Sequence, residues 1–292
     1  MAVTAITLVC NPADAILDED LRDAAADALL EAFGEVRRRT LSEDIAEDFL
    51  VEAAAGRDDV EGALRPVLGE APLDIIVQPA ADREKKLLIA DMDSTIIGQE
   101  CIDELADFAG LKAEISAITE RAMRGELDFE AALTTRVGML KGLSERVLDE
   151  CFRTRITLNP GAETLVATMN ARGAATVLVS GGFTFFVERV AKMAGFRHFR
   201  ANELLIDGGR LTGEVRRPIL GREAKEAALR QHAKEAGVSL ARTMAAGDGA
   251  NDLDMIKAAG LGLAYRAKPV VAVEADAEIK HTSLETALYF QG

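Results

Sequence analysis

The chain has 292 residues, of which 49% are hydrophobic and 28% charged. It can therefore build a sizeable core, and a disulfide-stapled mini-protein or a disordered chain is excluded. Its formal net charge of −15 argues against a general nucleic-acid or anionic-membrane binder. Three cysteines without a CxxC spacing predict neither a disulfide framework nor a cysteine metal site. They fit a reducing cytoplasm, where we expect this protein.

Neither a membrane span nor a secretory signal is expected. The longest uncharged stretch, Gly173 to Val187, falls short of the ~20 residues that cross a bilayer. No Lys or Arg precedes Arg22, so the basic region of a signal peptide is missing. The final residues Leu288–Gly292 resemble the remnant of a protease-site tag, and a native helix end is the alternative.

Residues 1–80 are expected to form a separate small α+β domain. Alternating and helical spacings of apolar residues predict the order βαββαβ, which indicates a ferredoxin-like sandwich. The predicted elements are a strand at Ala2–Cys10, a helix at Glu19–Phe33, strands at Glu35–Thr40 and Ile45–Val51, a helix at Val60–Leu68 and a strand at Leu73–Val77. The polar segment 78–84 is typical of a linker, and no catalytic pattern is visible in this domain.

From Lys85 onward, short continuous apolar runs alternate with helical stretches. The runs are typical of strands buried on both faces, and their alternation with helices predicts an α/β fold with a doubly wound parallel sheet. The predicted strands are Leu87–Ala90, Ala175–Val179, Thr243–Ala246 and Leu261–Ala264. The predicted helices between them are Thr164–Arg172, Phe185–Ala194, Arg222–Glu235 and Asp252–Ala259.

A long helical insertion separates the first two core strands. It is too long for a simple crossover, so residues 100–152 are expected to form a helical cap above the strand ends. The catalytic core is then expected to comprise residues 81–99 and 153–292.

Two aspartates close the first core strand, in the run Asp91-Met-Asp93-Ser-Thr95. Ligands of open parallel sheets bind outside the carboxyl ends of the strands, so both carboxylates are expected in that crevice. Two carboxylates in different surroundings can divide the work, since one can ligate a metal and attack while the other transfers protons. The alternative is turn chemistry, in which Asp and Ser cap the following helix.

A second loop, Ser180-Gly181-Gly182, follows the next core strand. Glycine allows close backbone approach, so the serine hydroxyl and consecutive N–H groups can cradle a phosphate. A plain strand-to-helix turn has the same composition and remains an alternative. Lys225 stands in a charged helix, where a surface lysine is the ordinary interpretation.

The third loop, Gly247–Asp252, adds the carboxylates of Asp248 and Asp252. Hard oxygen donors without His or Cys point to Mg²⁺. Asn251 and Asp252 are also suited to cap the helix that follows, which is the alternative.

Taken in chain order, these motifs resemble the haloacid dehalogenase superfamily of phosphotransferases, whose opening motif DxDxT corresponds to Asp91–Thr95. The stretches DMDSTII, ERAMRGELDFEAAL, SGGFTFF, GDGANDLDMIKAAGLG and AYRAKP are similar to the phosphoserine phosphatase family within it. The resemblance covers about Leu87 to Lys280 and implies a haloacid dehalogenase-like, Rossmann-type core with an inserted helical cap. The N-terminal domain is similar in position to the regulatory-type domain of longer bacterial members.

The resemblance implies an Mg²⁺-dependent phosphatase that hydrolyses O-phospho-L-serine to L-serine and phosphate, the last step of serine biosynthesis. It implies that Asp91 is the nucleophile that forms an aspartyl-phosphate and that Asp93 is the general acid and base. Mg²⁺ is expected on Asp91, Asp248 and the main-chain carbonyl oxygen of Asp93. Asp252 is expected to orient the metal's waters, and Asn251 to hold the geometry of the site.

Further residues match family positions that bind the substrate. The phosphoryl oxygens are expected to be held by Ser180, Gly181 and Lys225. Glu100 matches the residue that takes the ammonium, and Arg136 the residue that binds the carboxylate, for which a planar fork is suited. Met123 and Phe129 match apolar residues that close over the ligand. Without the resemblance, the two charged residues are ordinary solvated helix residues and the two apolar ones are core.

Two other functions remain open from the sequence. One is a relative that uses another phosphate ester or acceptor, such as a sugar-phosphate phosphatase or a phosphotransferase, against which Glu100 with Arg136 favours an amino-acid head group. The other is a response-regulator-like switch, against which Asp93 and the long insertion argue, because a switch needs a persistent phospho-aspartate. The oligomeric state, a homodimer included, and tolerance of D-phosphoserine are left open.

Overall fold

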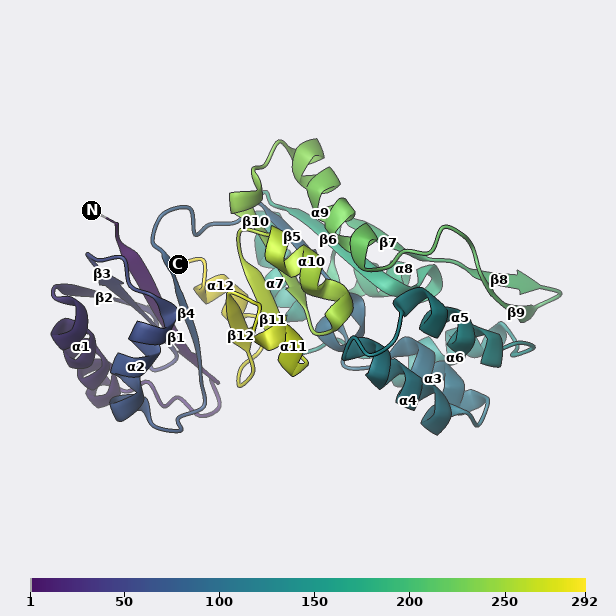
Figure 1. Cartoon of the computed structure of the whole chain (residues 1–292), viewed down its shortest axis with the longest axis horizontal. Coiled ribbons are helices and arrows are strands. Elements are labelled where there is room, and N and C mark those ends of the chain that lie inside the picture. Colours follow the sequence, from purple (N-terminus) through teal and green to yellow (C-terminus); the bar gives the residue numbers. More distant parts are fainter. Residues whose placement is uncertain (1) are drawn as a thin grey trace. The chain divides into compact units, whose positions relative to one another are not determined.

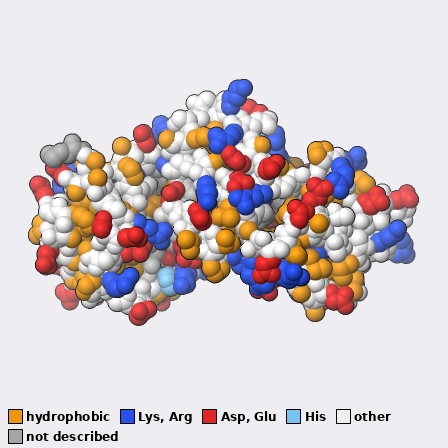
Figure 2. Space-filling view, in the orientation of Figure 1, with side chains coloured by type: hydrophobic (Ala, Val, Ile, Leu, Met, Phe, Trp, Pro, Cys, Tyr) orange, Lys and Arg blue, Asp and Glu red, His pale blue; other side chains and the backbone are white. Residues whose placement is uncertain are grey.

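A computed structural model describes residues 2–292, which divide into two compact units. Unit 1 comprises the N-terminal residues up to Lys85 together with Asp276–Gly292, and unit 2 comprises Lys86–Ala275. Basic and acidic side chains are interspersed over the face seen in Figure 2, so the excess of negative charge is dispersed there. Among the described residues, no helix is long and apolar enough to cross a membrane.

Unit 1 contains a four-stranded antiparallel sheet in the order β2-β3-β1-β4. Apolar side chains of both helices pack on one face of it and form the core of the unit. The predicted βαββαβ order is confirmed, with β1 (Thr4–Cys10), α1 (Glu19–Phe33), β2 (Val36–Ser42), β3 (Ala46–Val51), α2 (Arg57–Leu68) and β4 (Leu73–Pro79). Helix α1 begins where expected because the Asp18 carboxylate accepts a hydrogen bond from the N–H of Leu21 at 2.9 Å.

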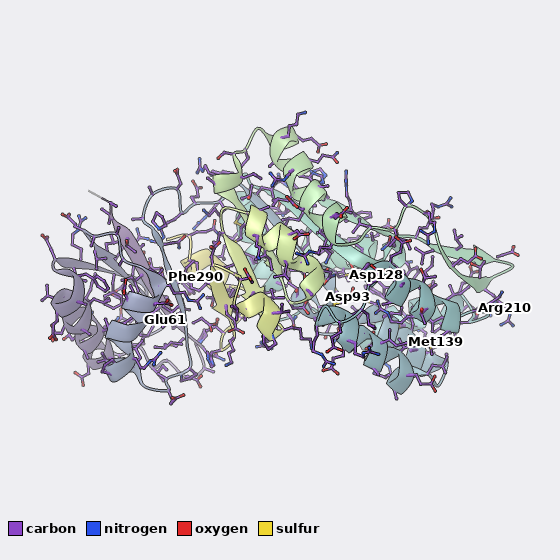
Figure 3. The ribbon with its side chains drawn as sticks, in the orientation of Figure 1. Glu61, Asp93, Asp128, Met139, Arg210 and Phe290 are labelled. Atoms are coloured by element: carbon purple, nitrogen blue, oxygen red, sulfur yellow. The ribbon has the colours of Figure 1, made fainter. Side chains whose placement is uncertain are left out.

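The C-terminal segment, with β12 (Ala277–Ile279) and α12 (Thr286–Tyr289), folds as part of unit 1, whereas the sequence-based division placed it in the catalytic core. The Asp74 carboxylate in β4 accepts hydrogen bonds from three consecutive backbone N–H groups, those of Lys280, His281 and Thr282. Phe290, labelled in Figure 3, is fully buried, and its carbonyl oxygen accepts a hydrogen bond from Arg83 Nε at 3.3 Å. These last residues are therefore packed within unit 1.

Unit 2 is built on parallel strands in the order β11-β10-β5-β6-β7, which confirms the predicted doubly wound sheet. Helices α7 and α8 cover one face of the sheet, and α9 and α10 cover the other (Figure 1). The strands are β5 (Leu87–Ala90), β6 (Ala175–Phe183), β7 (His198–Asn202), β10 (Thr243–Gly247) and β11 (Gly262–Tyr265). The helices are α7 (Ala162–Ala171), α8 (Thr184–Ala194), α9 (Arg222–Ala236), α10 (Leu253–Ala258) and the short α11 (Pro269–Ala272).

Four helices between β5 and α7, α3–α6, form the inserted segment and lie together beside the sheet in Figure 1. A hairpin of β8 (Leu204–Asp207) and β9 (Arg210–Val215), which the sequence reading missed, packs against α5. The four helices are α3 (Cys101–Phe108), α4 (Lys112–Met123), α5 (Phe129–Met139) and α6 (Arg146–Arg155). Asp128, labelled in Figure 3, starts α5 by accepting a hydrogen bond from the N–H of Ala131 at 2.8 Å, and the ring of the next residue, Phe129, lies against Gly181 of β6. This places the first turn of α5 over the ends of the core strands.

Candidate active site

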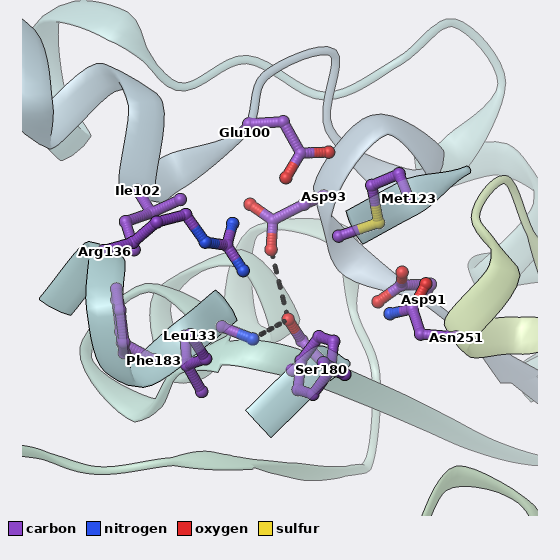
Figure 4. Close-up of a pocket in the computed structure, with 13 residues that line it drawn as sticks. Asp91, Asp93, Glu100, Ile102, Met123, Leu133, Arg136, Ser180, Phe183 and Asn251 are labelled. Carbon is purple, nitrogen blue, oxygen red and sulfur yellow. Dashed lines mark hydrogen bonds between the residues drawn. The ribbon is translucent and has the colours of Figure 1, made fainter. Parts of the chain in front are cut away.

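Asp91 and Asp93 lie in the loop that leaves the carboxyl end of β5. Asp91 is 5% exposed, and its Oδ1 accepts a hydrogen bond from the N–H of Met92 at 2.7 Å. Asp93 accepts hydrogen bonds from the N–H of Cys101 at 2.8 Å and from the Ser180 hydroxyl at 3.1 Å (Figure 4). Burial raises the pKa of both carboxyls, with repulsion from Asp252 adding to the shift at Asp91, while the two hydrogen bonds oppose the shift at Asp93. Two carboxyls with different partners therefore sit side by side.

Lys225 is fully buried and joins two of the acidic side chains. Its Nζ lies 2.8 Å from Asp91 Oδ2 and 2.6 Å from Asp252 Oδ1. Burial alone would lower the pKa of Lys225, but attraction to Asp252 and Asp91 outweighs it and raises that pKa above its ordinary value. The lysine is therefore a fixed cation inside the site rather than a surface residue.

The loop after β10 brings Asp248 and Asp252 to the same place. Asp248 accepts a hydrogen bond from the Thr95 hydroxyl at 2.9 Å, and burial with repulsion from Asp252 raises its pKa to about 7. Asp252 Oδ2 accepts hydrogen bonds from the N–H groups of Asp248 and Gly249, both at 3.1 Å. Asp252 thus stabilises the loop and contacts Lys225, and its side chain makes no capping hydrogen bond to the helix that follows, α10, as the alternative interpretation would have required.

The residues present fit a divalent cation with oxygen ligands. Oxygens of three buried carboxylates, those of Asp91, Asp248 and Asp252, lie within 4.8 Å of one another without His or Cys among them. Both oxygens of Asp252 already accept hydrogen bonds, and both oxygens of Asp91 contact Met92 N–H or Lys225, so Asp248, which accepts from Thr95 through Oδ1, has the less engaged carboxylate. The buried Oδ1 of Asn251 has no hydrogen-bond partner within the described chain. This oxygen is a further acceptor available to a ligand.

The charge balance of the site also favours a bound cation. Within the described part of the chain, five carboxyl groups meet two cationic side chains, Lys225 and Arg136. Burying uncompensated negative charge is costly, so added positive charge should stabilise this arrangement. The five carboxyl groups belong to Asp91, Asp93, Glu100, Asp248 and Asp252.

The end of β6 contains Ser180, Gly181 and Gly182, next to the loop that carries Asp91 and Asp93. The Ser180 hydroxyl oxygen accepts a hydrogen bond from the N–H of Gly182 at 2.8 Å. A side chain at Gly182 would come within 2.9 Å of Asp93 Oδ2, so glycine is needed there for the close approach. On the opposite side, the Asn202 side chain donates a hydrogen bond to the carbonyl oxygen of Gly181 at 2.8 Å. The turn is thereby held with a hydroxyl and backbone groups facing the pocket.

Met123 and Phe129 come from the inserted helices and close the pocket against glycines of the core. A Cβ on Gly181 would lie 2.4 Å from Phe129 Cζ, and one on Gly249 would lie 2.8 Å from Met123 Sδ. These two apolar side chains therefore fit against the core only because the facing residues have no side chain. The two side chains thereby cover part of the pocket that Asp91 and Asp93 line.

Glu100 and Arg136 face the same pocket from the inserted segment (Figure 4). Glu100 Oε1 accepts a hydrogen bond from the Ser94 hydroxyl at 2.6 Å, and burial with repulsion from Asp93 raises its pKa well above the ordinary value. Arg136 is 2% exposed, and burial lowers its pKa while Glu100 and Asp103 oppose this. A half-buried acid and a buried guanidinium that line the same pocket suit a ligand with both an ammonium and a carboxylate.

All twelve residues singled out from the sequence come together here. Nine of them line one pocket, and the other three, Lys225, Asp248 and Asp252, surround Asp91. The nine are Asp91, Asp93, Glu100, Met123, Phe129, Arg136, Ser180, Gly181 and Asn251. The pocket also uses Ile102, Leu133 and Phe183, whose sequence signal is ordinary core periodicity. Sequence reasoning gave no role to the hydroxyls of Ser94 and Thr95, which donate hydrogen bonds to Glu100 and Asp248. Their place in the motif DMDST was the signal that could have identified them.

Comparisons with known proteins match this geometry. The sequence profile of haloacid dehalogenase-like hydrolases matches residues 88–257. A phosphoserine phosphatase of Streptococcus thermophilus is 48% identical over 200 residues, covering 68% of this chain and 93% of its own. One of Archaeoglobus fulgidus is 42% identical over 244 residues, covering 82% of this chain and 70% of its own.

Solved structures are similar in fold to this chain, one over nearly its whole length and two over most of it. A hydrolase of this family from Salmonella enterica serovar Typhi has a TM-score of 0.83 at 30% identity, covering 99% of this chain and 98% of its own. A substrate-bound phosphoserine phosphatase has a TM-score of 0.68 at 39% identity, covering 71% of this chain and 98% of its own. A phospho-aspartyl intermediate analogue of phosphoserine phosphatase has the same TM-score of 0.68 at 40% identity, covering 71% of this chain and 99% of its own. The chain belongs to the haloacid dehalogenase-like hydrolases.

Proposed function

We propose that this enzyme hydrolyses O-phospho-L-serine to L-serine and phosphate through an aspartyl-phosphate on Asp91. The observation that carries the proposal is one pocket in which Glu100 and Arg136 face the nucleophile and its neighbour Asp93. The two curated relatives described above are both phosphoserine phosphatases, which supports the same substrate. The product places the reaction at the last step of serine biosynthesis.

In the first half-reaction, an Asp91 oxygen attacks phosphorus and forms an O–P bond, while the bond from phosphorus to the serine oxygen breaks. Asp93 donates a proton to the departing serine oxygen. Burial raises the pKa of Asp93, which favours the protonated form that this step needs. The Ser180 hydroxyl, 3.1 Å from Asp93 Oδ2, keeps that carboxyl at the pocket.

In the second half-reaction, Asp93 takes a proton from water as the water attacks phosphorus, and Asp91 leaves as a carboxylate. The phosphoryl oxygens are bound by Ser180, the N–H of Gly181 and Lys225, which oppose the charge spread over a loose transition state. Lys225 also lies 2.8 Å from Asp91, so it offsets repulsion between an anionic nucleophile and an anionic ester.

Mg²⁺ is the cofactor that best fits the acidic cluster. Asp91, Asp248 and the main-chain carbonyl oxygen of Asp93 would hold it, with Asp252 orienting its waters and Asn251 supporting the geometry. When bound, it would supply Lewis-acid stabilisation of the phosphoryl oxygens. Thr95, which donates to Asp248 at 2.9 Å, fixes one ligand in place.

The amino-acid part of the substrate is recognised by charge. Arg136 binds the carboxylate through the planar fork that suits it, and Glu100 accepts the ammonium. Met123 and Phe129 cover the ligand, and the exclusion of water strengthens both contacts. We place the reaction in the cytoplasm, since the three cysteines are buried and free in the structure.

A panel of phosphate esters tests this proposal. Phosphoserine should have the highest kcat/KM, and phosphoethanolamine, which lacks the carboxylate, should be poor. Arg136→Ala should lose roughly 10- to 10³-fold in kcat/KM on phosphoserine, the effect of a lost charge-assisted hydrogen bond in a closed site. Preference for a sugar phosphate, or equal losses on both esters, would show that Arg136 does not select the substrate.

A further inference from the structure

Arg136 is connected to two residues that lie outside the pocket. Its Nη1 donates to the Thr119 hydroxyl oxygen at 2.9 Å, and its Nε donates to the carbonyl oxygen of Ala132 at 3.2 Å. The Thr119 hydroxyl lies 2.6 Å from Asp103 Oδ1 and 3.0 Å from the carbonyl oxygen of Ile115. Because a hydroxyl has one hydrogen, the shorter contact identifies Asp103 as its acceptor, which leaves a lone pair for Arg136.

This hydrogen-bonded chain crosses three helices of the inserted segment. Asp103 belongs to α3, Thr119 to α4 and Arg136 to α5. The exposed fractions of these residues are 9%, 3% and 2%, so the chain is shielded from water. Of the described residues that line the pocket, Arg136 is one, while neither Thr119 nor Asp103 is among them. Thr119 therefore reaches the pocket through Arg136, whereas Asp103 also donates its backbone N–H to the carbonyl oxygen of Glu100 at 3.0 Å.

The orientation of Arg136 needs such support because acidic groups surround it. Its guanidinium points towards Asp93 in Figure 4, and Glu100 and Asp93 both attract it. A flexible side chain in that field would form an ion pair with a catalytic acid and would no longer present its fork to a substrate. Two of its N–H groups are instead tied to Thr119 and to its own helix, which leaves the remaining ones for a ligand.

We propose that Thr119 and Asp103 are positioning residues, which fix the Arg136 guanidinium so that its remaining N–H groups are presented to the substrate carboxylate. The inference rests on the proposed function, since it assigns the selectivity of the same pocket. It requires that losing the Thr119 hydroxyl weakens only substrates that carry a carboxylate.

The test compares Thr119→Val, which removes the hydroxyl at equal size, with Thr119→Ser, which keeps it. On phosphoserine, Thr119→Val should lower kcat/KM roughly 10- to 100-fold, mostly through KM, as one lost hydrogen bond to a charged group does. On phosphoethanolamine the change in kcat/KM should stay below about threefold, because this ester has no carboxylate for Arg136 to bind. Thr119→Ser should return phosphoserine kcat/KM to within about threefold of the parent. Thr135→Val is the matched control, since that exposed hydroxyl donates to the Ala131 carbonyl oxygen of its own helix at 2.8 Å.

Asp103→Asn extends the test if Thr119→Val does not fold. Its amide keeps an acceptor for Thr119 but removes the charge, so a smaller loss of roughly three- to tenfold on phosphoserine is expected, larger than the loss on phosphoethanolamine, since Asp103 also acts on Glu100. Equal fold-losses on both esters, or no loss on either, would overturn the positioning role. A parent enzyme that does not hydrolyse phosphoserine would instead refute the proposed function, so the two failures are distinguishable.

Discussion

Replacing Lys225 by methionine should strongly destabilise unit 2 in the absence of metal. The lysine is fully buried, and its Nζ lies 2.8 Å from Asp91 and 2.6 Å from Asp252, so the substitution leaves two buried carboxylates without their cation. Breaking a buried ion pair in this way costs about 3–5 kcal/mol. For a unit of this size each kcal/mol lowers Tm by about 2–4 °C, so Tm should fall by about 6–20 °C.

The loss should grow with pH. Burial and repulsion from Asp252 raise the pKa of Asp91 in the folded state, and Lys225 opposes that rise. A carboxyl whose pKa is higher in the folded state than its unfolded value of about 3.9 contributes its full stabilisation when the pH is below the unfolded pKa. That stabilisation is lost as the pH rises through the folded-state pKa. Removing Lys225 raises the folded pKa further, so the variant should lose more relative to the parent at pH ~8 than at pH ~5.

Thermal unfolding followed by circular dichroism in EDTA, at both pH values, measures these effects. Lys234→Met on the same helix is the matched control, because that lysine is exposed. A Tm for Lys225→Met equal to that of the control, or a loss that does not change with pH, would refute the assignment of Lys225 as the fixed cation of the site.

Three further predictions follow from the site. Asp93→Asn should lower kcat roughly 10²- to 10⁴-fold, the usual effect of a lost general acid and base, with little change in Tm, and near-parent turnover would exclude that role. Gly181→Ala should reduce kcat/KM on all phosphate esters, because its Cβ would lie 2.4 Å from Phe129 Cζ, and Phe129→Ala in the same chain should restore part of the loss. EDTA should abolish activity and Mg²⁺ restore it, whereas Ca²⁺, which prefers more ligands at longer distances, should inhibit; full activity without metal would contradict the acidic cluster as a metal site.

The elements that the sequence predicted well are those with a strong local signal. Leu87–Ala90 is continuously apolar, and Glu19–Phe33 combines helical spacing with a capping aspartate, so both were predicted at their observed bounds. The hairpin of β8 and β9 was missed because its strands are short and only partly buried, although the Gly208-Gly209 turn was a usable signal.

Contacts between residues far apart in the chain were not predictable from local patterns. Asp74 binds backbone N–H groups more than 200 residues away, so nothing in its own neighbourhood indicated that Asp276–Gly292 would join unit 1. The same holds for Thr119, whose helical position predicts a buried face but gives no indication of Arg136 as its partner. Motif spacing identified the strand-end residues of the site, whereas Glu100 and Arg136 were found through resemblance alone.

Trapping the phosphorylated enzyme during turnover tests the central claim most directly. Phosphoserine labelled with radioactive phosphorus is mixed with enzyme and metal, the reaction is quenched in acid within a turnover, and the phosphorus label bound to protein is counted. In a parallel sample the acyl-phosphate is reduced with tritiated borohydride, which releases the phosphate and leaves a tritium-labelled homoserine at the phosphorylated position. The mechanism predicts serine release ahead of phosphate, label at Asp91 alone, and no label in Asp91→Asn. Phosphate release from phosphoserine without labelled protein, or label retained in Asp91→Asn, would contradict it.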